Sequence, residues 1–205
     1  MTRPTFVLAS ASPARLRTLR AAGLEPEVIV SGVDESNVES SSAAALCAML
    51  ARLKAEAVVS RLRHHGTHPD ALVLGCDSLL DFEGQILGKP VDAAEATKRW
   101  QELRGRSGVL HTGHCLVRVT DGAAAEAVAS TTVYFADASD AEIDAYVGTD
   151  EPVQVAGAFT IDGLGGWFIE RIDGDAGTVI GVSLPVLRGL LTDLGVAVAD
   201  LWPAH

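Results

Sequence analysis

Cysteines and long apolar runs are both scarce in this chain, and each shortage excludes a class of protein. The three cysteines, Cys47, Cys76 and Cys115, lie far apart and match no zinc-binding or redox spacing. We therefore expect free thiols in a reducing compartment. No apolar stretch approaches the length of a membrane span, and the short apolar run near the N-terminus does not resemble a signal peptide. The sequence thus predicts a cytoplasmic protein with no membrane partner.

Basic residues are scarce as well. The chain has 16 Lys and Arg against 27 Asp and Glu, which gives a net charge of −11. A sequence-independent grip on nucleic acid needs a basic surface, so we expect no nucleic-acid partner. A small anionic ligand stays possible, because an acidic protein can hold a local basic pocket. With 205 residues, 48% of them apolar, the chain can form one domain over residues 1–205 or two closely packed lobes.

Apolar runs that predict strands alternate with segments that predict helices. Ser12 and Pro13 are typical of a helix start, and Asp121 with Gly122 predicts a tight turn between two long strands. The predicted strands span 6–9, 27–30, 71–74, 86–87, 109–119, 126–135 and 167–172, and the predicted helices span 13–22, 43–63, 93–103, 139–147 and 183–194. This alternation predicts an α/β fold with a mixed sheet.

The first strand leads directly into a helix whose start carries Ser10, Ser12 and Arg15. Unpaired N–H groups and the positive end of the helix dipole favour phosphate at such a corner. An arginine there can bind phosphate through two hydrogen bonds. For a single such corner, however, an ordinary capped helix with solvated arginines is the favoured interpretation.

Asp77 follows the apolar run 71–74, so we expect it at or near the end of a buried strand, with Lys89 twelve residues later between a glycine and a proline. A carboxylate there needs a compensating cation, metal or proton. The alternative is an aspartate that only caps a turn. This segment alone does not separate the two interpretations.

Glu35 and Lys54 are also ambiguous when each is taken alone. Glu35 lies among acids after the second strand, where solvated side chains are common but where a magnesium ligand is possible. Lys54 lies beside the apolar stripe predicted for the long helix, which includes Met49 and Leu53. Its amine points either into a cleft or along the surface to water.

Taken together and in order, these stretches resemble the Maf family of nucleoside triphosphate pyrophosphatases, relatives of the inosine-triphosphate pyrophosphatase fold. The segments that carry the resemblance are 8–15, 31–35, 75–78, 87–90, 150–152, 156–163 and 181–185. The resemblance implies hydrolysis of a nucleoside triphosphate between its α and β phosphorus atoms, which yields a monophosphate and pyrophosphate. It also implies a mixed twisted sheet flanked by helices, two lobes with a central cleft, and a homodimer.

The resemblance also implies roles for individual residues. Asp77 matches the proton acceptor, and Glu35, with Asp77, matches the positions that hold a divalent cation, Mg²⁺ or Mn²⁺. The positions implied to bind substrate are Ser10, Ser12, Arg15, Lys54, Ser78, Lys89 and Asp162. Because a nearby cation lowers the pKa of a carboxyl, we expect Asp77 to be a weak base that ligates metal and orients water.

Three positions depart from the pattern of family members specific for dTTP and UTP. Ala14 replaces an arginine, Ser78 a threonine and Asp162 a glutamine. A carboxylate only accepts hydrogen bonds, whereas an amide also donates them, so we do not carry that specificity over. Two other functions compete with the pyrophosphatase. One is a nucleotide-binding regulator of cell division without turnover, and the other is a phosphatase with an aspartyl nucleophile, for which Asp77 and Asp81 are wrongly spaced.

Overall fold

The computed structural model describes residues 3–36, 38 and 40–203, and within them one seven-stranded sheet runs through the molecule. Its order is β2-β1-β3-β5-β6-β7, and β4 also pairs with β3. The strands are β1 (Phe6–Leu8), β2 (Glu27–Val28), β3 (Leu72–Phe82), β4 (Gln85–Leu87), β5 (Ser107–Arg118), β6 (Ala124–Phe135) and β7 (Ile169–Asp173). β1 is parallel to β2 and β3, and the other pairs are antiparallel. The predicted mixed α/β sheet is confirmed.

The helices begin where the sequence offers capping side chains. The hydroxyls or carboxylates of Ser12, Ser42, Asp92, Ser139 and Ser183 each accept a backbone N–H in the first turn of a helix. The helices are α1 (Pro13–Ala21), α2 (Ala43–His65), α3 (Ala93–Leu103), α4 (Asp140–Val147), α5 (Ala176–Ile180) and α6 (Leu184–Asp193), with 3₁₀ turns η1 (Pro152–Gln154), η2 (Ala156–Ala158), η3 (Leu164–Phe168) and η4 (Val198–Leu201). Among the described residues, no helix is long and apolar enough to cross a membrane.

Helix α2 lies directly against β3 and β5 because the two strands present glycines to it. A Cβ atom on Gly75 or Gly113 would clash with backbone atoms of α2. The face of α2 that meets the strands is therefore rich in small residues such as Ala51 and Ala55. The stripe predicted from the sequence is wrong at Met49 and Leu53, which are 44% and 36% exposed. The sequence prediction placed the large apolar residues on the buried face of α2. The close approach at Gly75 and Gly113 instead buries the face with small residues.

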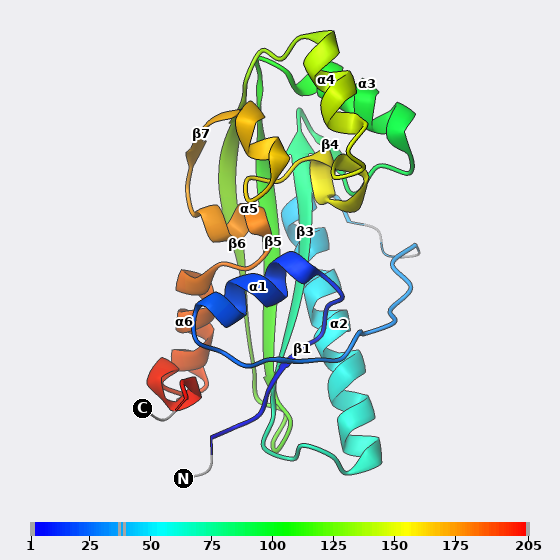
Figure 1. Cartoon of the computed structure of the whole chain (residues 1–205). Helices are drawn as coiled ribbons and strands as arrows, with labels where there is room; N and C mark the ends of the chain where they lie inside the picture. Colours follow the sequence, from blue (N-terminus) through cyan, green and yellow to red (C-terminus); the bar gives the residue numbers. More distant parts are fainter. Residues whose placement is uncertain (1–2, 37, 39, 204–205) are drawn as a thin grey trace.

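Apolar clusters pack against the three long strands toward both ends of the molecule. One cluster is built around Trp100, which meets Phe135 and Tyr146 edge to face, and it includes residues of α3, α4, η1, η2 and η3. Two further clusters pack β1, α1, α2 and α6 around the opposite halves of the strands. Figure 1 shows α3 and α4 at one end of the molecule and both termini at the other. The cleft described below is lined from both ends, as expected for two lobes.

Several boundaries differ from the sequence prediction, most of all that of β3, which extends to Phe82 and not only to residue 74. The strand expected from Trp167 begins at Ile169, because Trp167 and Phe168 form the end of η3. The short helix α5 was not predicted, since its five residues carry only an Asp175 cap and no apolar period. This helix proves important for the site.

Candidate active site

Asp77 lies in the middle of β3 rather than at its end, which corrects the prediction. On one edge of β3, pairing with β1 covers Phe6–Leu8 opposite 72–74, and pairing with β4 begins at Leu80. On the other edge Asp77 is paired with Gly113 of β5. The carboxylate thus lies on a continuous strand, beside a gap in the sheet between β1 and β4. The sequence suggested an end because Gly75, Asp77 and Ser78 interrupt the apolar run.

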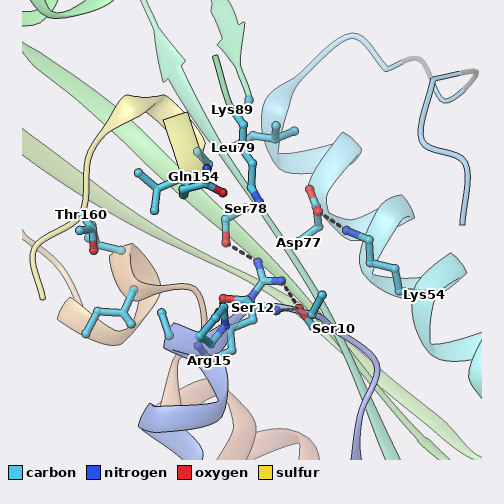
Figure 2. A pocket seen from close by; sticks show the side chains of 18 of the residues that line it. Ser10, Ser12, Arg15, Lys54, Asp77, Ser78, Leu79, Lys89, Gln154 and Thr160 are labelled. Atoms are coloured by element: carbon cyan, nitrogen blue, oxygen red, sulfur yellow. Dashed lines mark hydrogen bonds and ion pairs between the residues drawn. The ribbon is translucent and has the colours of Figure 1, made fainter. Parts of the chain in front are cut away.

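The carboxylate of Asp77 is paired with a lysine from α2. Lys54 Nζ lies 2.5 Å from Asp77 Oδ1 (Figure 2). The same Nζ lies 2.7 Å from Glu35 Oε1. Asp77 and Lys54 are only 7% and 9% exposed, whereas Glu35 is exposed. Lys54 therefore points into the cleft, and the surface alternative is excluded. A buried carboxylate of this kind is tolerated because the ammonium compensates it.

Burial raises the pKa of Asp77, against the opposing effects of the Lys54 ammonium and the Arg15 guanidinium. This direction contradicts the low pKa expected from a nearby cation alone. The expectation considered the partner charge but not the loss of hydration, which disfavours the ionised form. A carboxylate with a raised pKa is a better proton acceptor, which suits the proton-acceptor role that the resemblance implies for Asp77.

The corner between β1 and α1 is largely occupied by its own side chains. Ser12 Oγ accepts the Arg15 N–H at 3.4 Å, and Ser10 Oγ accepts the Ser12 N–H at 3.2 Å. Arg15 is only 8% exposed, and its Nη1 donates to Ser10 Oγ at 2.9 Å. The interpretation of Arg15 as a solvated arginine is wrong. Ser12 is engaged as a helix cap, as its sequence context predicted.

Lys89 follows β4 and enters the cleft from the opposite lobe (Figure 2). The carbonyl of the preceding residue, Gly88, accepts two hydrogen bonds. One comes from Arg99 Nη1 at 2.6 Å and the other from the Gly157 N–H at 3.0 Å. The backbone that carries Lys89 is therefore fixed, while its side chain is exposed and free to meet an anion.

All the predicted site residues line one cleft with a volume of about 1030 Å³. The set comprises Ser10, Ser12, Arg15, Glu35, Lys54, Asp77, Ser78, Lys89 and Asp162. Residues this far apart in sequence converge because α1, α2, β3 and the segment after η2 meet at the gap in the sheet. Asp81 is not among the lining residues, and its carboxylate accepts the Gly84 N–H in the β3–β4 turn. The paired-aspartate phosphatase therefore has no support here.

Among the lining residues that sequence reasoning missed are Arg17, Gln154 and Thr160. Arg17 Nη2 lies 2.9 Å from Asp162 Oδ2, and the Thr160 hydroxyl donates to the other oxygen of Asp162. Asp162 is thus an engaged carboxylate at the cleft mouth. Arg17 could have been found, because it lies three residues after Ala14 and so on the same side of α1. Gln154 and Thr160 carried no comparable signal.

The donor set suits a hard divalent cation only in part. Asp77 and Glu35 place two carboxylates around one ammonium, and carboxylate oxygen is the donor that Mg²⁺ prefers. Within the described residues there is no group of three or more His, Cys, Asp or Glu side chains suited to a metal. The pair therefore fits a cation that phosphate oxygens help to hold, and not one enclosed by protein alone.

Comparison with known proteins agrees with this geometry. The family described as Maf-like protein matches residues 5–194. The chain belongs to this family. A Maf-like relative from Salinispora tropica, named nucleoside triphosphate pyrophosphatase, is 65% identical over 96% of this chain and 87% of its own length. Relatives with the same name from Streptomyces coelicolor and Rhodococcus opacus are 55% and 50% identical, over 98% and 97% of this chain and 95% and 96% of their own lengths.

Proposed function

We propose that this Maf-like protein hydrolyses the α–β phosphoanhydride of nucleoside triphosphates and releases pyrophosphate. One observation carries the proposal: a buried carboxylate, Asp77, shares a single cleft with Lys54 and Lys89, which come from opposite lobes. A triphosphate brings about four negative charges, and such a cleft offers cations on both sides of it. The printed names of the relatives support the same reaction.

In the proposed mechanism each residue of the cleft has a role that follows from its position. Lys54 and Lys89 neutralise the triphosphate and the charge that grows on it in the transition state. Asp77 accepts a proton from the attacking water, a role suited to its raised pKa. Burial fixes Asp77 and Lys54 in advance, so little reorganisation accompanies the reaction. Ser10 lies beside them at the end of β1, with its hydroxyl oxygen already accepting hydrogen bonds.

We further propose a divalent cation, Mg²⁺ or Mn²⁺, held by Glu35 and Asp77 together with substrate phosphate oxygens. When bound, such a cation supplies charge neutralisation and lowers the pKa of bound water. Dialysis against a chelator, followed by addition of either metal, tests this part. Full activity after chelation would remove the cation from the proposal without touching the reaction itself.

The reaction is tested by pyrophosphate release across a panel of standard and modified nucleoside triphosphates. The wild type is expected to release pyrophosphate, and Asp77→Asn to lose about 10²–10⁴-fold in kcat with an unchanged circular dichroism spectrum. Asp81→Asn is the matched control, since it lies on the same strand outside the cleft. Nucleotide binding without turnover by the wild type would favour the regulator, and release of orthophosphate would favour a phosphatase.

We also propose a cytoplasmic homodimer, for which the support is the resemblance to the family. Light scattering coupled to size exclusion tests the assembly over a range of protein concentrations. A mass that corresponds to one chain at every concentration would contradict the dimer and would leave the proposed reaction standing.

A further inference from the structure

Arg15 directs its guanidinium at the protein rather than at the open cleft. Its Nε donates to the Gly181 carbonyl at 2.8 Å, and its Nη1 donates to the Cys76 carbonyl at 2.9 Å. Nη1 also donates to Ser10 Oγ, and Nη2 donates to Ser78 Oγ at 2.9 Å. All but one of the N–H donors of the Arg15 guanidinium are therefore used within the protein. Little remains for a bidentate phosphate contact.

Ser78, which accepts a hydrogen bond from Arg15, is linked to Thr112 and Thr178 by further hydrogen bonds whose donors and acceptors are fixed. Thr112 Oγ1 donates its single hydrogen to the Thr178 carbonyl at 2.7 Å, because a carbonyl can only accept. The Ser78 hydroxyl, 2.8 Å from Thr112 Oγ1, must then donate to Thr112. Ser78 accepts from Arg15 and has no hydrogen left for a substrate (Figure 2). The chain of hydrogen bonds ends on helix α5.

These contacts surround Asp77 on its own strand. Arg15 holds the residue before it through the Cys76 carbonyl and the residue after it through the Ser78 hydroxyl. Thr112 is fully buried on β5, directly opposite Ser78 in the strand register. The β1–β4 gap leaves this edge of β3 without a strand partner, so Arg15 and Ser10 stand where a neighbouring strand would otherwise be.

Helix α5 is shaped to receive this network. Gly181 ends the helix at a φ of +116°, and a Cβ atom there would lie 2.9 Å from Arg15 Nε. The free carbonyls at the end of a helix carry partial negative charge and need donors. Thr178 and Gly181 supply two such carbonyls, which Thr112 and Arg15 satisfy. The helix that sequence reasoning missed is thus the anchor for both.

We propose that Arg15, Ser78 and Thr112 form a positioning network that fixes the β3 segment carrying Asp77, and that Arg15 is a positioning residue and not a triphosphate ligand. The proposal rests on the pyrophosphatase reaction proposed above. It assigns a role to Thr112, which lies outside the cleft lining. It also implies that Ser78 offers the substrate an acceptor lone pair and no donor.

Thr112→Val tests the network, because valine keeps the shape and removes the hydroxyl. A small displacement of Asp77 is expected to lower kcat by about 10–10²-fold, with KM unchanged within about twofold. Thr112→Ser restores the hydroxyl and is expected to restore kcat to within about threefold. The matched control is Thr131→Val on β6: Thr131 is equally buried, and its hydroxyl donates to the Asp175 carbonyl at the start of the same helix.

The two valine variants are expected to lose similar thermal stability, and only Thr112→Val to lose turnover. Equal kinetic losses in both would mean that Thr112 is merely structural, and would overturn the proposal. If Thr112→Val does not fold, Ser78→Ala measures the same link from the other side. A Ser78→Ala variant with unchanged kcat would overturn it equally.

Arg15→Lys separates positioning from phosphate binding, since lysine keeps the charge but cannot make the same forked contacts. The network predicts a kcat lower by about 10²-fold, while the Kd for pyrophosphate measured by calorimetry changes less than about threefold. A Kd that rises more than tenfold with normal kcat would identify Arg15 as a ligand and refute the assignment. The double variant Arg15→Lys with Thr112→Val is expected to lose little more than Arg15→Lys alone, because both act through one network.

The outcome for this network is separable from the outcome for the reaction. A wild type that releases no pyrophosphate from any triphosphate would refute the proposed function. An active wild type whose Thr112→Val and Arg15→Lys variants turn over normally would refute the network alone.

Discussion

The floor and the mouth of the cleft differ in how they hold charge. At the floor, Asp77, Lys54 and Arg15 are buried, and each is fixed by partners from separate elements. At the mouth, Arg17 and Asp162 form an ion pair that water reaches, with the Arg17 side chain 64% and the Asp162 side chain 25% exposed. Water screens the exposed pair and allows it to rearrange, whereas burial makes each contact at the floor costly to break. We therefore infer that the proposed reaction takes place at the floor, and that the mouth is free to vary with the substrate.

Removal of the buried ammonium is the most severe test of this contrast. Lys54→Gln is expected to lower kcat/KM by about 10²–10³-fold, since a triphosphate then meets one cation fewer in a low-dielectric site. Lys54 also lowers the pKa of Asp77, so the acid limb of the pH profile of kcat/KM should move to higher pH. Arg17→Gln removes a cation at the mouth and should leave that limb in place. A limb unmoved in Lys54→Gln would show that Asp77 does not control it.

Buried and exposed histidines should likewise differ in how they make the stability of the protein depend on pH. Burial, together with the nearby Arg15 guanidinium, lowers the pKa of His114 from 6.5 to about 4, against the opposing effects of the Thr112 and Ala127 backbone and of Asp175. Above pH 6.5 the group is neutral in both states, and as the pH falls toward 4 only the unfolded chain takes up the proton. The free energy of unfolding should therefore decrease by about 3 kcal/mol across that window and then level off. Urea unfolding at several pH values measures it.

His114→Gln is the variant that isolates this effect, because an amide oxygen can still accept the Ser183 N–H that His114 Nε2 accepts at 2.9 Å. The variant is expected to lose that part of the pH dependence, while the exposed His65→Gln keeps it. Equal slopes in the wild type and in His114→Gln would contradict the assignment of the effect to this imidazole.

Much of the local structure could be predicted from sequence, since capping residues and turns are local signals. The Ser12 cap and the Asp121–Gly122 turn fall as expected, and the candidate residues converge on one cleft. Three features depended on contacts between distant segments. β3 continues past Asp77 because β5 pairs along it, α2 turns its small face inward because Gly113 and Gly75 admit it, and burial raises the pKa of Asp77. A short stretch of sequence around Asp77 does not show which strand will pair with it, nor that its carboxylate will lose its hydration on folding.

Mutations at the mouth should have the smallest effects on stability and on the fastest kcat, and their effects on rate should depend on the substrate. An exposed ion pair contributes at most about 1 kcal/mol, so Arg17→Gln and Asp162→Asn should each change stability by less than that. Asp162→Gln exchanges an acceptor for a group that also donates, which should reorder the rates across the triphosphate panel while the fastest kcat changes only a few-fold. Equal activity of the wild type and Asp162→Gln on every triphosphate would remove Asp162 from substrate selection. The mouth would then be a lobe-to-lobe contact, and selection would have to lie elsewhere in the cleft, where Gln154 and Thr160 are candidates.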